Sequence, residues 1–109
     1  MSQFSEVLAR LQATIDARKG ADPASSYTAK LLAGGAPLAA KKFGEEAIET
    51  ALAAVQSDPE AVAAESADLI YHWLVLLTAC GVSLDAVAAK LEAREGRSGI
   101  EEKAARPAS

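Results

Sequence analysis

Residues 67–77 read Ala-Asp-Leu-Ile-Tyr-His-Trp-Leu-Val-Leu-Leu, and they lie in the most apolar stretch of the chain. At helical spacing their apolar side chains point in every direction, and a helix that is apolar all round is buried on all sides. Asp58 and Pro59 are residues preferred at a helix start, and Gly81 is typical of a helix end. The stretch therefore predicts one long, buried helix over about residues 59–80.

Apolar residues recur at helical spacing on both sides of this helix as well. They predict long helices over residues 4–18, 38–56 and 83–94, and a short helix over residues 25–32. The run Gly34-Gly35-Ala36-Pro37 is expected to interrupt the chain before the helix that begins at Leu38. No segment alternates in the manner of a strand, so the predicted fold class is all-α, a helical bundle of about four long helices.

We expect one domain over residues 1–96 and a flexible C-terminal tail over residues 97–109, because the tail has few apolar side chains. A chain of 109 residues, half of them apolar and many of those alanine, buries only a modest core. Four helices of this size leave one side of residues 59–80 bare. The sequence therefore predicts a homodimer with an intertwined or shared helical core.

Composition argues against several classes of function. The formal net charge is −4 and there is no long basic run, so a nucleic-acid partner is not expected. Cys80 is the single cysteine, which rules out an internal disulfide and a zinc site built from several cysteines. The N-terminus does not resemble a signal peptide, and the longest apolar run is far short of the roughly 20 residues that span a bilayer. We expect a cytoplasmic protein that does not enter membranes.

Acidic residues on two successive predicted helices carry the main functional signal. Glu45, Glu46 and Glu49 fall within an arc of about 100° on the first of these helices. Glu65 and Asp68 are spaced i, i+3 on the next helix and share one face. Two antiparallel helices would bring four of these side chains together, those of Glu46, Glu49, Glu65 and Asp68.

A simpler interpretation is that these acids only coat solvated helix faces. Lys41 with Glu45, and Lys42 with Glu46, would then be i, i+4 ion pairs worth a few tenths of a kcal/mol. This interpretation fits Asp68 poorly, because Asp68 precedes the most apolar stretch and an unpartnered carboxylate is costly to bury. The core-facing stripe of the first helix is predicted to be Ile48, Leu52 and Val55.

Four clustered carboxylates would repel one another unless a cation is bound between them. Oxygen ligands suit a hard ion, so Mg²⁺ is the expected cofactor, with Mn²⁺ as the alternative. A di-iron site in a helical bundle uses Glu-x-x-His pairs, and Asp68 and His72 are spaced i, i+4 instead. Iron is therefore not expected.

These residues also resemble a known family. Glu-Glu-x-x-Glu at residues 45–49 and Glu-x-x-Asp at residues 65–68 resemble the signature of the all-α nucleotide pyrophosphatase superfamily, the MazG-like enzymes. The flanks are more specific: Ser-Tyr-Thr-Ala-Lys-Leu-Leu at residues 26–32, Lys-Lys-x-Gly-Glu-Glu at 41–46 and Ala-Asp-Leu-Ile-Tyr-His at 67–72. With these flanks the chain resembles the phosphoribosyl-ATP pyrophosphatase family over about residues 4–94.

The resemblance implies hydrolysis of the α–β phosphoanhydride of phosphoribosyl-ATP, which gives phosphoribosyl-AMP and pyrophosphate in the second step of histidine biosynthesis. It also implies a dimer of helical bundles. Magnesium chemistry agrees with this reaction, because a polyphosphate needs charge neutralisation and an in-line water.

The expected roles follow from the same resemblance and chemistry. The metal ligands are Glu46, Glu49, Glu65 and Asp68, and the catalytic carboxylates are Glu45, Glu46 and Glu49, with Glu45 as a further ligand or as the base that orients water. The phosphate-binding candidates are Lys30, Lys41 and Lys42. Residues that contact substrate or support the site are Tyr27, Thr28, His72 and Arg94, although a lone histidine on an apolar helix is more often a hydrogen-bonded core residue.

Two other functions compete with this interpretation. One is a house-cleaning pyrophosphatase of non-standard nucleoside triphosphates, in the same superfamily and with the same metal chemistry. The other is a non-catalytic helical dimerisation module in which the acids are surface decoration. The module predicts no effect of Mg²⁺ on the melting temperature, whereas the enzyme predicts stabilisation by Mg²⁺.

Overall fold

The computed structural model describes residues 3–96, and its regular structure over that range is helical throughout. The five helices are α1 (Gln3–Ala17), α2 (Tyr27–Ala33), α3 (Gly35–Val55), α4 (Pro59–Cys80) and α5 (Leu84–Glu92). The all-α class is confirmed, and the short helix predicted over residues 25–32 is present as α2 beside the four other predicted helices. The predicted tail over residues 97–109 lies outside the described residues.

The ends of α4 and the start of α5 follow from local capping chemistry. The Asp58 side chain accepts a hydrogen bond from the backbone N–H of Ala61 at 3.1 Å. Gly81 ends α4 in the left-handed conformation, with φ at 71°, where a residue without Cβ is favoured. Ser83 caps α5 by accepting from the N–H of Ala86 at 3.1 Å. The predicted bounds of α4 are confirmed, whereas α5 ends two residues before the predicted Arg94.

The junction between α2 and α3 differs from the prediction, because α3 begins at Gly35 rather than Leu38. Gly34 separates the two helices, and Gly35 turns the chain with φ at 70°. A Cβ on Gly34 would lie 2.4 Å from Cδ2 of Leu38, so only glycine fits there. Pro37 is accommodated in the first turn of α3 because the N–H groups there have no intrahelical acceptor.

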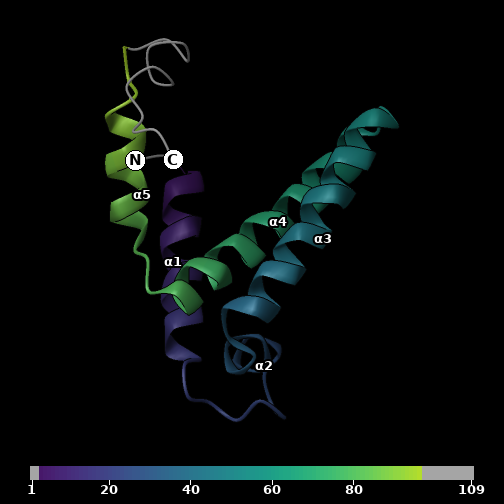
Figure 1. Cartoon of the computed structure of the whole chain (residues 1–109). Helices are drawn as coiled ribbons and strands as arrows, with labels where there is room; N and C mark the ends of the chain where they lie inside the picture. Colours follow the sequence, from purple (N-terminus) through teal and green to yellow (C-terminus); the bar gives the residue numbers. More distant parts are fainter. Residues whose placement is uncertain (1–2, 97–109) are drawn as a thin grey trace.

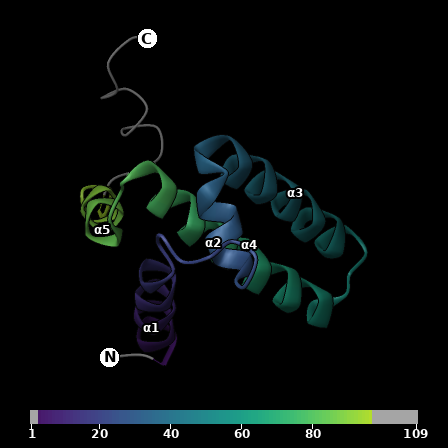
Figure 2. The same cartoon turned by 90° about the horizontal axis from the view of Figure 1, so that it is seen from below.

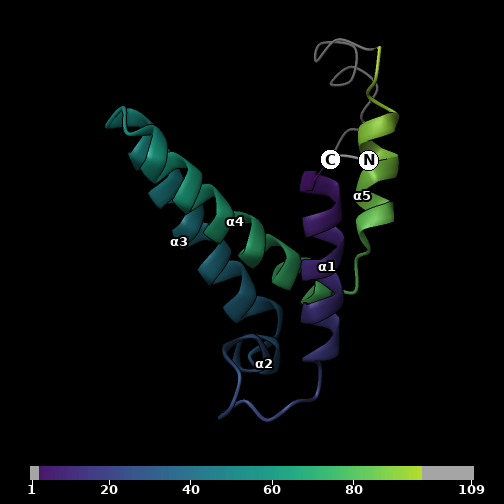
Figure 3. The same cartoon turned by 180° about the vertical axis from the view of Figure 1, so that it is seen from behind.

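Helices α3 and α4 form a long antiparallel hairpin, which is the dominant packing unit of the chain (Figure 1). Viewed from below, α2 lies across the start of this hairpin (Figure 2). The hairpin leans away from α1 and α5, so the molecule is an open V rather than a closed bundle (Figures 1 and 3). α1 packs against α4 where the two arms of the V meet.

The buried core lies at this junction and combines side chains from four helices. Its buried members are Ile15 of α1, Leu31 of α2, Ala39 of α3 and the pair Leu74 and Val75 of α4. Partly buried apolar side chains from all five helices extend it, among them Leu8, Leu32, Leu38, Trp73 and Leu84. The core therefore fixes the base of the hairpin and leaves its far end without a covering helix.

One burial prediction is wrong for the single chain because of that openness. Ile48, Leu52 and Val55 were expected to face the core, but they are 64%, 53% and 81% exposed. The helix over residues 59–80 was expected to have a bare side in the single chain, and its contacts with the core lie in its C-terminal half. Its fully buried apolar residues are Leu74 and Val75.

Within residues 3–96, no single helix combines the length and hydropathy needed to cross a bilayer. Only α4 and α5 taken together have that length and hydropathy, and they are bent by 106° relative to each other.

Candidate functional site

The α3–α4 hairpin brings three glutamates from facing helices to one point. Glu46 and Glu49 stand one turn apart on α3, and Glu65 lies opposite on α4. One carboxylate oxygen from each of the three lies within 4.8 Å of the others. Glu46 and Glu65 are half-buried and Glu49 is exposed. The sequence prediction that these three acids converge is confirmed by this geometry.

Two of these carboxylates have a buried oxygen without a partner. Within residues 3–96, Oε2 of Glu46 and Oε2 of Glu65 are inaccessible to solvent and no hydrogen bond reaches either of them. Buried polar atoms are nearly always paired, and leaving a carboxylate oxygen unpaired costs free energy. An oxygen-only set of closely spaced, unsatisfied carboxylates fits a hard divalent cation such as Mg²⁺ or Mn²⁺.

The crowding of negative charge also raises the pKa of two of these carboxyls, those of Glu46 and Glu65. Burial raises the pKa of Glu46 above its usual value, the charges of Glu49 and Asp68 raise it further, and His72 opposes them. The pKa of Glu65 is raised first by the Glu49 carboxyl, because the two can share a hydrogen bond only when one of them is protonated, and then by burial and by the neighbouring charges. Without a cation the fold therefore favours protonated carboxyls at this point.

Asp68 lies next to this group without belonging to it. It stands one turn after Glu65 on α4 and is exposed, so the expectation of a buried Asp68 is wrong for the single chain. Its charge nevertheless raises the pKa of both Glu46 and Glu65, so it lies close enough to act on the cluster electrostatically. Its role as a fourth ligand stays a prediction.

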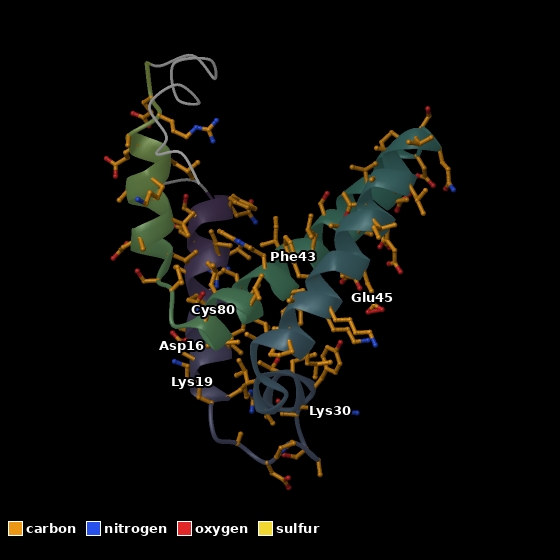
Figure 4. All side chains as sticks on the ribbon, in the orientation of Figure 1. Asp16, Lys19, Lys30, Phe43, Glu45 and Cys80 are labelled. Carbon is orange, nitrogen blue, oxygen red and sulfur yellow. The ribbon has the colours of Figure 1, made fainter. Side chains whose placement is uncertain are left out.

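The basic residues around the start of the acidic motif are exposed. The ion pair that the described residues form here joins Nζ of Lys42 to Oε1 of Glu45 at 3.4 Å, spaced i, i+3, in place of the two i, i+4 pairs considered from the sequence. Such a solvent-exposed pair adds little stability. Figure 4 shows Glu45 directed outward from α3, and Lys41 is exposed as well.

His72 connects the acidic helix α4 to the start of α2. It is buried, its Nδ1 lies 2.8 Å from the backbone carbonyl of Asp68, and its Nε2 lies 3.3 Å from Oη of Tyr27. A carbonyl only accepts, so Nδ1 carries a proton and donates, and when the imidazole is neutral the Tyr27 hydroxyl donates to Nε2. The interpretation of His72 as a hydrogen-bonded core residue therefore agrees with the structure.

Two further contacts hold α2 in place beside α4. The hydroxyls of Thr28 and Tyr71 are hydrogen-bonded at 2.5 Å. The rings of Tyr27 and Tyr71 stack with centroids 6.4 Å apart. The sequence suggested roles for Tyr27 and Thr28, but their partners lie more than 40 positions away, and no spacing in the sequence signals such contacts.

The remaining predicted residues lie apart from the three glutamates. Lys30 is exposed on α2 and lines an open pocket of about 600 Å³ formed with residues 23–27. Arg94 is exposed two residues beyond the end of α5, and α5 lies on the arm of the V away from the hairpin (Figure 1). The single chain therefore does not bring Arg94 to the acidic cluster.

The facing carboxylates of the α3–α4 hairpin are spaced for a divalent cation, and lysines lie at the edge of the hairpin. These features define a class of all-α protein that could bind an anionic substrate through a metal ion. The sequence pattern of one such family, described as "Phosphoribosyl-ATP pyrophosphohydrolase", matches residues 8–95. The chain belongs to this family of enzymes, as the sequence motifs predicted.

Individual relatives agree with this assignment. The chain is 69% identical over 107 residues to "Phosphoribosyl-ATP pyrophosphatase" of Caulobacter sp. strain K31, an alignment covering 98% of this chain and 99% of the relative. It is also 69% identical over 107 residues to the protein of the same name from Caulobacter vibrioides, covering 97% and 99%. The Parvibaculum lavamentivorans protein of that name is 58% identical over 106 residues, covering 97% of both.

Proposed function

We propose that the chain hydrolyses phosphoribosyl-ATP to phosphoribosyl-AMP and pyrophosphate, the second step of histidine biosynthesis, with Mg²⁺ held by carboxylates of α3 and α4. Family membership and the names of the near full-length relatives support the reaction. We propose that residues 1–96 form the catalytic domain and that the reaction takes place in the cytoplasm.

The observation that carries the proposal is the pair of unpartnered, buried oxygens on Glu46 and Glu65. A merely decorative acidic surface would leave such oxygens in water, where hydration satisfies them. Here the fold withdraws them from water and places them next to a third carboxylate, that of Glu49. A bound cation converts this unfavourable arrangement into a ligand set.

Glu46, Glu49 and Glu65 hold the cation in this proposal, and Asp68 completes or supports the set. Mg²⁺ bound there supplies charge neutralisation for the polyphosphate and acidifies an attacking water. His72 fixes the backbone of Asp68 through its Nδ1 hydrogen bond.

The side chains of Lys41, Lys42 and Glu45, at the edge of the hairpin, contact the substrate and water rather than the cation in this proposal. Lys41 and Lys42 meet phosphate oxygens as point charges. Glu45 is pulled toward Lys42 at 3.4 Å in the free chain. Binding of a phosphate to Lys42 competes with that ion pair and frees the Glu45 carboxylate to orient water.

A homodimer is the second part of the proposal. Ile48, Leu52 and Val55 share one exposed face of α3 at spacing i, i+4, i+7, which is an apolar stripe that water disfavours. Leu52 also lines a shallow pocket of about 230 Å³ together with Glu49 and Glu65. A second copy packed on the stripe therefore shields the cation site from bulk water as well.

The test is pyrophosphate release from phosphoribosyl-ATP by the purified chain, with Mg²⁺ or with excess EDTA. We expect turnover with Mg²⁺ and its loss with EDTA. A parallel series with dUTP, dCTP and ATP separates this activity from that of a house-cleaning pyrophosphatase. Efficient hydrolysis of those triphosphates without hydrolysis of phosphoribosyl-ATP would overturn the assignment of substrate, and growth of a histidine-requiring strain carrying the gene would support it.

A further inference from the structure

Phosphoribosyl-ATP differs from ATP by one added phosphoribosyl group, which carries its own phosphate. The triphosphate and its metal ion are common to both molecules, so the acidic cluster cannot tell them apart. To discriminate phosphoribosyl-ATP from ATP, the enzyme requires a second anion-binding site at a distance from the bond that is cleaved. The location of this second anion-binding site is inferred here on the basis of the proposed function.

One pocket of the described surface has the chemistry for it. It has a volume of about 600 Å³ and is lined by Pro23, Ala24, Ser25, Ser26, Tyr27 and Lys30. Lys30 gives it a positive charge, and its lining contains no carboxylate. A pocket beside Lys19, between α1 and the end of α4, also contains Asp16, and the pocket at the acidic cluster contains Glu49 and Glu65. A second pocket beside Lys19, of about 450 Å³, has no carboxylate in its lining, but apart from Thr78 its other lining residues are glycine or apolar, and Lys19 also borders the pocket that contains Asp16. The pocket at Lys30 combines a lysine with two serine hydroxyls and no carboxylate, so it suits an anion better than these.

The hydrogen bonds of the pocket leave donors available. The Oγ of Ser26 accepts the capping bond from the N–H of Ala29 at 3.2 Å, so its own proton is free to be donated. Asp22, the acid closest to the lining in the sequence, is not part of the lining, and its Oδ1 accepts a hydrogen bond from the N–H of Ala24 at 3.0 Å. The exposed ring of Tyr27 adds an apolar wall against which a sugar or a base can lie.

The pocket is also fixed in position relative to the metal ligands. Tyr27, which forms one wall, donates to His72, and His72 in turn donates to the carbonyl of Asp68. The Tyr27 ring stacks on that of Tyr71 on the same helix. Two hydrogen bonds and a ring contact thus tie the pocket to the segment of α4 that faces Glu46. Figure 4 shows Lys30 extending to the side of the molecule on which Glu45 also projects.

We propose that this pocket binds the phosphate of the phosphoribosyl group and that Lys30 is the residue by which the enzyme prefers phosphoribosyl-ATP to ATP. The Lys30 ammonium pairs with the phosphate, and the Ser26 hydroxyl donates a second hydrogen bond. Tyr27 holds the pocket at a set distance from the cation site, so that both ends of one substrate are bound together.

The experiment compares Lys30→Gln with the wild type and with a matched control, Lys90→Gln, which changes an exposed lysine on α5. The KM and kcat for phosphoribosyl-ATP are measured by pyrophosphate release with Mg²⁺, and ATP is titrated as a competing ligand to obtain its Ki. Loss of a charge-assisted hydrogen bond to phosphate raises KM for phosphoribosyl-ATP by roughly ten- to a hundredfold. The Ki of ATP changes by less than about threefold, and Lys90→Gln changes neither constant.

A parallel rise in KM and in the Ki of ATP would place Lys30 on the shared triphosphate and overturn the proposal. An unchanged KM would also overturn it, because Lys30 would then contact no phosphate. A wild type that fails to release pyrophosphate from phosphoribosyl-ATP would contradict the proposed function itself. An active wild type with an unaffected variant would contradict only the subsite.

Discussion

The hydroxyl of Tyr27, the first residue of α2, lies 3.3 Å from Nε2 of the buried His72 in the middle of α4. The other ring nitrogen of His72 is bonded to the backbone of Asp68 at 2.8 Å. The imidazole therefore joins the short helix α2 to the helix that bears Glu65 and Asp68. Both polar atoms of a buried side chain are satisfied by this arrangement, as stability requires.

Tyr27→Phe removes this hydrogen bond and keeps the ring. We expect the free energy of unfolding to fall by about 1 kcal/mol, because Nε2 of His72 is left buried without a donor. Urea denaturation measures the change. Thr28→Ser, which keeps the hydroxyl that bonds Tyr71, is the control and should change stability less. Equal stability of Tyr27→Phe and wild type would mean that water replaces the tyrosine hydroxyl.

Glu65→Gln removes one negative charge from the crowded site. Without metal we expect a higher melting temperature than that of the wild type, because repulsion with Glu49 and Glu46 is relieved. With Mg²⁺ we expect the opposite order and a loss of activity of roughly a hundredfold or more, since one of the charged ligands of the cation is missing. Thermal melts with and without Mg²⁺ and pyrophosphate release provide the two readouts.

Glu92→Gln, at the end of α5 and away from the cluster, is the matched control for Glu65→Gln. It should leave the Mg²⁺-dependent rise in melting temperature unchanged. If both variants respond to Mg²⁺ as the wild type does, Glu65 is not a ligand.

The raised pKa values of Glu46 and Glu65 predict how stability depends on pH. A carboxyl whose pKa is raised by folding holds its proton more tightly in the native state than in the unfolded chain. In EDTA, the contribution of these two groups to stability is therefore fully present below the unfolded value of about 4.5 and is lost as the pH rises through the folded values.

Mg²⁺ removes this penalty because it binds the deprotonated carboxylates. The stabilisation by Mg²⁺ should therefore be larger at pH 7.5 than at pH 5. Urea denaturation at both pH values, with Mg²⁺ and with EDTA, measures the difference. Equal stabilisation at the two values would show that the cation binds elsewhere.

Leu52→Asp tests the apolar stripe on α3. A buried leucine contributes about 1.5–3 kcal/mol, and a buried aspartate adds a further cost. We expect the dissociation constant of the dimer to rise roughly a hundredfold or more, as measured by analytical ultracentrifugation. Val82→Asp, which changes an exposed apolar residue after α4, should leave association intact. A wild type that stays monomeric at high concentration would refute the dimer directly.

Gly34, which lies between α2 and α3, and Gly44, which lies inside α3, should respond in opposite directions to replacement by alanine. Gly34→Ala places a Cβ 2.4 Å from Cδ2 and 2.7 Å from Cβ of Leu38, so we expect destabilisation of about 1–3 kcal/mol. Gly44 lies inside α3 with nothing within 4 Å of an added Cβ, so Gly44→Ala should stabilise by up to about 1 kcal/mol. Urea denaturation of both variants checks the signs, and a stabilising Gly34→Ala would show that Leu38 moves aside.

The acidic cluster was predictable from sequence because its geometry is local. Spacing placed Glu46 and Glu49 on one face of a helix, and the Asp58–Pro59 start signal fixed where the next helix begins. An antiparallel hairpin with so short a connection brings Glu65 opposite them. Capping residues determine such a hairpin without reference to the rest of the molecule.

Burial and long-range contacts were less predictable, because they depend on which helix packs against which. The stripe of Ile48, Leu52 and Val55 has core periodicity, yet the open V leaves it uncovered in one chain. The same openness leaves Asp68 exposed. The pairing of Tyr27 with His72 depends on how α2 lies across α4, and nothing in the spacing of the two residues encodes that placement.

The unpaired oxygens of Glu46 and Glu65 bear on how the chain reaches its native state. The turn at residues 56–58 lets α3 and α4 meet early, because closing a short loop costs little entropy. Bringing the glutamates together opposes that step, since like charges approach one another while water is withdrawn from them. Divalent ions therefore stand to accelerate the collapse of this hairpin, and their concentration in the refolding buffer becomes a determinant of folding speed as well as of turnover.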